Sequence, residues 1–201
     1  MATQIAPAVN ILRRDIQEKY TEVAGSPKLE FHFHHGRPLA KILEYKDEFL
    51  EDVPDEAVES FAGVGNPFSA GEIAPGETVL DVGSGSGFDC FIAAKMVGPT
   101  GKVIGVDMTD AMLEKSRKTA DNMGLTQLEF KKGFAEKLPV PDASVDVVIS
   151  NGVINLTPDK YASFLEVFRV LKPGGRLYLA DVVVYKPVPD GAKAEVDLWT
   201  A

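Results

Sequence analysis

The stretch that decides the fold is VLDVGSGSG, residues 79–87, in which an apolar run leads directly into three glycines. Glycine permits positive φ and lets a ligand approach the backbone without a Cβ in the way. The first turn of a following helix offers unpaired amides to an anionic group. We therefore predict a buried strand, a tight turn and a helix, with a ligand at the turn. A tight turn that binds nothing is the alternative.

The spacing of the glycines narrows the choice of ligand. Gly83, Gly85 and Gly87 follow a G-x-G-x-G pattern, whereas dinucleotide-binding folds use G-x-G-x-x-G, so an NAD-dependent enzyme is disfavoured. Asp107 ends the next apolar run, about 20 residues further on, where a carboxylate is expected to bind ribose hydroxyls. Asp107 could instead cap the next helix, but Thr109 is better placed for that role. Met108 is a candidate for contact with an adenine face, or for core packing.

From Glu77 onward, short β-branched runs alternate with helical patterns. This alternation indicates a parallel sheet with helices on both faces, and right-handed crossovers limit the topology to doubly wound folds. We predict an α/β fold with a Rossmann-like, doubly wound, mostly parallel sheet. The predicted strands are Thr78–Val82, Lys102–Val106, Leu128–Lys131, Val145–Ser150 and Arg176–Val184, and the predicted helices are Phe88–Val97, Asp110–Met123 and Asp159–Leu171.

Residues 1–74 are helix-like and broken by turns. We predict that they form an N-terminal helical cap, and that residues 75–201 form the ligand-binding domain. The predicted helices of the cap are Val9–Ala24, Pro38–Tyr45 and Pro54–Phe61, with Pro54 in a favourable first-turn position.

Composition excludes several classes of partner. The 201 residues carry a formal net charge of −9, which argues against a nucleic-acid partner because phosphate binding depends on clustered Lys and Arg. No apolar run approaches the length that spans a membrane, and Met1 to Asn10 lacks the features of a secretory signal. The single cysteine, Cys90, rules out an internal disulfide and suits a reducing compartment. We therefore expect a cytoplasmic protein.

Three groups of residues resemble the motifs of class I methyltransferases, which use S-adenosylmethionine. They are residues 81–87 (DVGSGSG), 105–108 (GVDM) and 171–175 (LKPGG), and the resemblance extends over about residues 75 to 186. Within that class, residues 148–151 (VISN) and 153–160 (VINLTPDK) are most similar to arsenite methyltransferases. The quinone-biosynthesis C-methyltransferases match this last stretch less closely.

The resemblance implies a cofactor site for S-adenosylmethionine, with S-adenosylhomocysteine as the product. The glycine loop would border the methionine part, Asp107 would bind the ribose, Ala135 and Glu136 would edge the adenine, and Asn151 would lie beside the methyl donor. Glu136 could equally be an exposed loop carboxylate, and Asn151 a buried turn residue. The candidate cofactor-binding residues are Asp81, Gly83, Ser84, Gly85, Ser86, Gly87, Asp107, Met108, Ala135, Glu136 and Asn151.

Cysteine usage separates this chain from the arsenite methyltransferases that it resembles. As(III) is a soft thiophile, so a protein that positions it should offer several thiolates. The arsenite family has a cysteine directly after the asparagine of the fourth-strand motif, where this chain has Gly152. Cys90 matches an earlier cysteine of that family, but its apolar neighbours favour a small buried hydrophobe. A later family cysteine would fall past Ala201.

Two segments, the histidine-rich stretch and the end of the fifth strand, suggest further roles. Alternation along residues 31–37 (FHFHHGR) would place His32 and His34 on one face, as metal ligands or a general base, although a solvated or structural cluster that also includes His35 is favoured. We predict no metal site. The resemblance also implies two further strands after the fifth, so an open hydrophobic edge at Leu177–Val184 is expected to pair with another chain, forming a homodimer.

These observations predict an S-adenosylmethionine-dependent methyltransferase that acts on a small-molecule acceptor. The reaction is a direct displacement, which needs alignment and exclusion of water and no covalent catalytic residue. The N-terminal helices are expected to cover the acceptor pocket. The alternatives are an arsenite or other metalloid methyltransferase and, from a different class, a non-catalytic cofactor-binding module.

Overall fold

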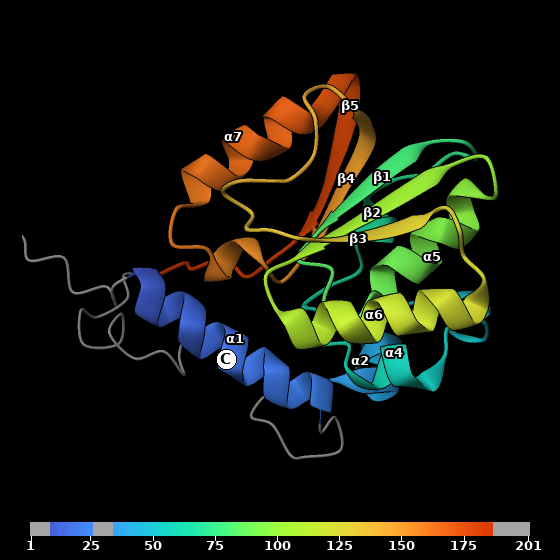
Figure 1. Ribbon diagram of the computed structural model, residues 1–201, viewed down its shortest axis with the longest axis horizontal. Coiled ribbons are helices and arrows are strands. Elements are labelled where there is room, and N and C mark those ends of the chain that lie inside the picture. The colour runs from blue at the N-terminus through green and yellow to red at the C-terminus, as the bar shows by residue number, and fades with distance from the viewer. Residues whose placement is uncertain (1–8, 26–33, 187–201) are drawn as a thin grey trace, which may run out of the picture.

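The computed structural model describes residues 9–25 and 34–186. Its centre is a five-stranded sheet with the order β3-β2-β1-β4-β5, in which every pairing is parallel (Figure 1). Strand order reverses beside β1, which pairs with β2 on one side and with β4 on the other. This is the doubly wound topology that the alternating pattern predicts. The strands are β1 (Thr78–Val82), β2 (Lys102–Asp107), β3 (Leu128–Lys132), β4 (Val145–Asn151) and β5 (Leu171–Ala180).

Helices cover both faces of the sheet, and alternate residues of each strand point to opposite faces. Val79 of β1 packs in one hydrophobic cluster with α5 (Phe88–Val97) and α6 (Asp110–Met123). Leu80, the next residue, packs in a second cluster with α7 (Lys160–Val170). The helix predictions in this half of the chain agree with the structure to within one residue at each end.

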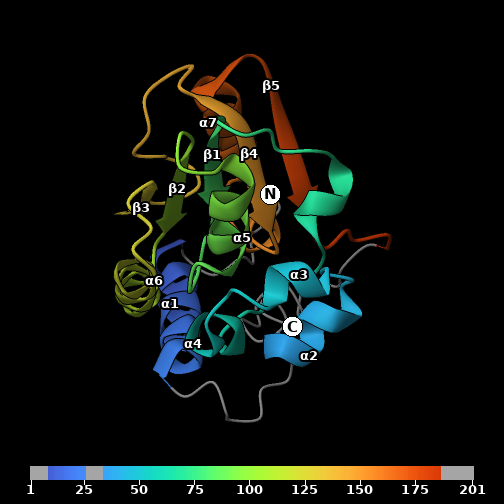
Figure 2. The same ribbon diagram turned by 90° about the vertical axis from the view of Figure 1, so that its right-hand side faces the viewer.

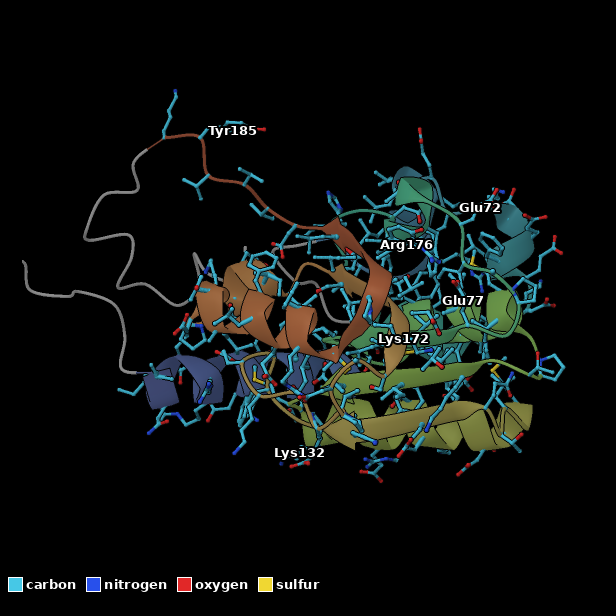
Figure 3. The ribbon with its side chains drawn as sticks, turned by 90° about the horizontal axis from the view of Figure 1, so that it is seen from above. Glu72, Glu77, Lys132, Lys172, Arg176 and Tyr185 are labelled. Carbon is cyan, nitrogen blue, oxygen red and sulfur yellow. The ribbon has the colours of Figure 1, made fainter. Side chains whose placement is uncertain are left out.

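The prediction for the fifth strand was wrong at both ends, because β5 spans Leu171–Ala180 and not Arg176–Val184. Pairing with β4 begins five residues earlier, since a register shift between Val145 and Val147 accommodates the turn-like residues 172–175. Pairing stops at Ala180 because its partner, Asn151, is the last residue of β4. Figure 3 shows Arg176 of β5 beside Glu77, with which it forms an ion pair of 2.7 Å, while Tyr185 lies well past the strand.

The N-terminal helices differ from their predictions in detail. α1 (Val9–Gly25) is one residue longer, α2 (Gly36–Ile42) starts and ends earlier, and α4 (Asp55–Glu59) is shorter. Pro54 is the N-cap residue of α4 and does not lie in its first turn. Asp55 and Glu56 occupy that turn, where carboxylates interact favourably with the helix dipole. Three short elements were not predicted from the sequence, namely α3 (Asp47–Leu50) and the 3-10 turns η1 (Pro67–Ala70) and η2 (Ile154–Leu156).

The N-terminal segment packs directly on the sheet half of the molecule. α1 and α4 both contact α6, and Figure 2 shows α1 beside α6. Leu39, Val58 and Phe61 share a hydrophobic core with α5 and β1. The division of the chain at residue 74 stays a prediction.

The histidine-rich stretch lies partly outside the described residues, which exclude His32 and its two phenylalanine neighbours. His34 is exposed, and Nδ1 of His35 lies 3.3 Å from the Glu59 carbonyl oxygen. Within the described ranges, no helix combines the length and the apolar character needed to cross a membrane.

Candidate functional site

A cavity opens at the carboxyl edge of the sheet, beside the ends of β1 and β4, where the strand order reverses. Its walls come from the glycine loop, the ends of β2 and β4, the loop after β3, helix α1 and the loop at residues 60–63. All the candidate cofactor-binding residues line it except Gly87. Gly87 is instead the N-cap residue of α5, and a Cβ on it would lie 2.9 Å from the Phe91 ring, so its role is to let the helix pack.

The glycine loop is held by backbone bonds to the neighbouring strand. Gly83 N and Ser84 N both donate to Val106 O, at 2.7 and 3.0 Å. Gly83 has φ +77°, and a Cβ on it would lie 2.2 Å from Cγ2 of Val153. Gly85 also has positive φ, but the space beside it is open. The loop therefore needs glycine at position 83 for its own packing, and at position 85 for its conformation and for access to the cavity.

Asp107 joins the glycine loop to the helix that follows β2. One carboxylate oxygen accepts from Gly85 N at 2.9 Å and the other from Thr109 N at 2.8 Å. Thr109 occupies the N-cap position of α6, as predicted, but its side chain makes no capping bond, and Asp107 instead accepts from the backbone amide there. Burial raises the pKa of Asp107, while the two amides oppose this shift. Each oxygen still has acceptor capacity for a ligand hydroxyl.

A buried acidic cluster lies beneath the loop. Asp89 accepts a bond of 2.7 Å from the Tyr45 hydroxyl and one of 3.1 Å from the Asn151 amide. Asp81 accepts a bond from the Cys90 thiol, with Sγ and Oδ2 3.2 Å apart. Burial raises the pKa of Asp89 to about 6 and, with the nearby Asp89 charge, raises that of Asp81 well above its ordinary value. Burial also raises the pKa of Cys90.

Asn151 connects this cluster to the N-terminal segment. Its side-chain oxygen accepts from Val64 N at 2.8 Å and Gly65 N at 3.1 Å, and its amide donates to Gly65 O at 2.9 Å. A Cβ on Gly63 would lie 2.4 Å from the same amide nitrogen. Asn151 therefore fixes the loop at residues 63–65 over the end of β4.

Helix α1 closes one side of the cavity with Arg13, Ile16 and Tyr20. The Gln17 side chain donates to Met108 O at 2.7 Å, which fixes the helix to the end of β2. Burial, with Asp107 nearby, raises the pKa of Tyr20 to about 12. Arg13, Gln17 and Tyr45 were not predicted from the sequence as parts of the site. Ile16 and Tyr20 lie within the predicted helix Val9–Ala24, but no local pattern indicated what that helix covers.

The cavity is strongly acidic. Asp81, Asp89, Asp107 and Glu136 all line it, and among the described residues Arg13 is the only lysine or arginine that does. Asp81 and Asp89 are 3% and 6% exposed. Buried carboxylates are costly unless a cation or several hydrogen bonds compensate them. The cavity therefore favours a cationic ligand that also carries polar groups for Asp107.

Comparison with known proteins agrees with this geometry. Residues 73–200 match a family described as a methyltransferase domain. An arsenite methyltransferase of Halobacterium salinarum is 51% identical over 158 residues, which make up 79% of this chain and 40% of that protein. A ubiquinone/menaquinone biosynthesis C-methyltransferase of Salmonella arizonae is 43% identical over 127 residues, covering 62% of this chain and 49% of that protein.

One solved structure extends the comparison to three dimensions. The crystal structure of an arsenic(III) S-adenosylmethionine methyltransferase from Chlamydomonas reinhardtii matches with a TM-score of 0.67 and 42% identity. The match covers 73% of this chain and 51% of that one. The chain thus spans about half the length, or less, of these relatives.

Proposed function

The chain belongs to the methyltransferase-domain family, and from that premise we propose that it transfers a methyl group from S-adenosylmethionine to a small-molecule acceptor. The observation that carries the proposal is the acidic cavity beneath the glycine loop. S-adenosylmethionine carries an ammonium and a sulfonium centre, which would compensate the buried carboxylates of Asp81 and Asp89. When bound, this cofactor supplies a methyl group activated by its positive sulfur.

Individual residues take distinct parts in this proposal. The Asp107 oxygens, already oriented by Gly85 N and Thr109 N, accept from the ribose hydroxyls. The glycine loop borders the methionine part, and Met108, Ala135 and Glu136 lie along the adenine. Asn151 acts through the loop that it holds, because its side chain already makes five hydrogen bonds within the protein.

The chemistry requires alignment more than acid or base groups. A lone pair of the acceptor forms a bond to the methyl carbon while the carbon–sulfur bond breaks, and its electrons remain on sulfur in S-adenosylhomocysteine. The loop at residues 60–63 and the segment Val153 to Pro158 line this end of the cavity, where they would limit the access of water to the reacting groups. The lining of the cavity continues past the glycine loop to this segment, and we propose that the acceptor binds there, which favours an enzyme over a non-catalytic binding module.

Arsenite is the second candidate acceptor, since the relatives at 51% and 42% identity are described as methylating arsenic. The thiol chemistry of this chain disfavours it. Cys90 is fully buried, bonded to Asp81, and has a raised pKa, so it is a poor thiolate ligand. Gly152 offers no thiol, and Val64 contacts the space where its side chain would be, at 3.2 Å.

Calorimetric titration with S-adenosylhomocysteine, with NADH in parallel, tests the cofactor. We expect micromolar binding of the first and none of the second. Asp107→Ala should abolish binding, whereas Asp110→Ala, which removes an exposed carboxylate paired with Lys132, should not. Release of S-adenosylhomocysteine across a panel of acceptors that includes arsenite then identifies the substrate. Binding of NADH alone would contradict the proposal.

We also propose that the chain self-associates through its β5 side and has no nucleic-acid partner. The observed strand ends earlier than predicted, but Leu179 of β5 and residues 182–185, which follow the strand, expose apolar side chains. Helix α7 adds Tyr161, Phe164, Leu165 and Phe168. Apolar patches of this kind are typical of interfaces. Light scattering should give the mass of a dimer, and Phe168→Glu should lower that mass. A monomer mass at every concentration would contradict this proposal.

A cytoplasmic location stays a proposal from composition.

A further inference from the structure

Arg13 enters the cavity from helix α1, outside residues 73–200 that match the family. Its guanidinium carbon lies 4.2 Å from the centroid of the Phe134 ring, which is a cation–π geometry. Its Nη2 lies 3.3 Å from Oε1 of Glu136, close enough for an ion pair. The side chain is thus held between two residues of the loop that follows β3.

Two polar atoms of this group are buried without a hydrogen-bond partner. They are Nε of Arg13, a donor, and Oε1 of Glu136, an acceptor whose contact with Arg13 lacks hydrogen-bond geometry. Leaving a buried donor and acceptor unpaired costs free energy, and native proteins rarely do so without a reason. A ligand that accepts beside Arg13 and donates beside Glu136 would satisfy both atoms.

The edge of an adenine base has this complement, because the exocyclic N6 amine donates beside a ring nitrogen that accepts. Within the proposed function, on which this inference rests, the base follows the ribose bound at Asp107 and lies toward Met108, Ala135 and Glu136. We propose that Arg13 completes the adenine site, donating to a ring nitrogen while Glu136 accepts from the N6 amine. The arrangement selects adenine over a base with a carbonyl at that position.

The position of α1 is fixed independently of Arg13, which makes the residue suitable for testing. Leu12 and Ile16 are each 2% exposed, and Gln17 bonds to Met108 O. Arg14, the next residue, has a side chain that is 63% exposed and pairs with Asp15. Arg13→Met and Arg14→Met therefore form a matched pair on one helix, and only the first reaches the cavity.

The experiment measures the affinities of purified variants for S-adenosylhomocysteine and for S-inosylhomocysteine, in which a carbonyl replaces the N6 amine. The wild type should prefer the adenosyl compound by at least about tenfold. Arg13→Met should weaken the binding of S-adenosylhomocysteine by about tenfold, and Arg14→Met should weaken it by less than about twofold. Glu136→Gln should reduce the preference between the two compounds severalfold, because a glutamine amide can also donate to the carbonyl.

Thermal unfolding without ligand separates binding from folding, and Arg13→Lys supplies a second variant if Arg13→Met is unstable. Equal affinities for Arg13→Met and Arg14→Met, or an unchanged preference in Glu136→Gln, would overturn the assignment while leaving the proposed function intact. Failure of the wild type to bind S-adenosylhomocysteine would instead overturn the proposed function, and the adenine site with it.

Discussion

The two sides of the cavity are built differently. On the glycine-loop side, backbone amides bond to the next strand, as in the contact from Gly85 N to Asp107, 22 residues apart. On the covering side, side chains bridge distant segments: Gln17 reaches Met108 across 91 residues, and Asn151 reaches Val64 N across 87. The first side depends on local conformation and the second on tertiary packing. Substitutions should therefore have their largest effects where a glycine carries the conformation, and smaller effects where one side-chain bond is lost.

The largest expected effect contrasts two glycines of the same loop. Gly83→Ala combines positive φ with a Cβ 2.2 Å from Val153, so it should lower the free energy of unfolding by about 3 to 5 kcal/mol. A Cβ at position 85 would contact no neighbouring atom, so Gly85→Ala should lower the free energy of unfolding by only about 1 to 2 kcal/mol, because of the φ of +51°. Urea denaturation measures both values. Equal costs would mean that packing against Val153 does not constrain the loop.

On the covering side, Tyr45→Phe removes one hydroxyl that bonds to both Asp89 and Asn151. Because a buried carboxylate loses a donor, we expect the free energy of unfolding to fall by about 2 kcal/mol. Tyr161→Phe, at a side chain on α7 that is 75% exposed, is the control and should change nothing measurable. An unchanged free energy of unfolding in Tyr45→Phe would show that the buried network does not hold the covering side of the cavity in place.

The pH dependence of stability tests the same network. Asp89 has a folded pKa of about 6, above the ordinary 3.8, so its contribution is fully present below about pH 4 and is lost as the pH rises through 6. Between pH 5 and pH 7 the wild type should lose about 1 kcal/mol more stability than Asp89→Asn. Urea unfolding of both proteins at the two pH values provides the comparison. Parallel pH profiles would place the titration elsewhere.

The smallest expected effect is that of Gln17→Ala, which removes the bond from α1 to Met108 O. Because the Gln17 side chain is only partly buried, we expect a loss of about 0.5 kcal/mol in unfolding free energy. Dissociation of S-adenosylhomocysteine should nevertheless become severalfold faster, since α1 covers the proposed adenosine end. Stopped-flow displacement measures this rate, and Glu18→Ala, at an exposed position on the same helix, is the control.

The same contrast explains what could be predicted from sequence. The glycine spacing, Asp107 and the alternating strands and helices are local patterns, and from them the doubly wound, parallel sheet and the position of the glycine loop could be predicted. The fifth strand was misplaced because its limits are set by β4, whose last residue pairs with Ala180, and not by the β-branched run at residues 182–184. Arg13 and Tyr45 had no local signal at all, because each acquires its role only when distant segments meet.

The contact between Cys90 and Asp81 has a practical consequence. Cys90 is the only cysteine in the sequence, and its side chain is fully buried beneath the glycine loop. An alkylating reagent can therefore reach it only when this part of the molecule opens, so the labelling rate under native conditions measures how often that opening occurs. The unmodified protein thus carries its own reporter, and a ligand that binds only the closed form will lower the rate of Cys90 alkylation as its occupancy rises.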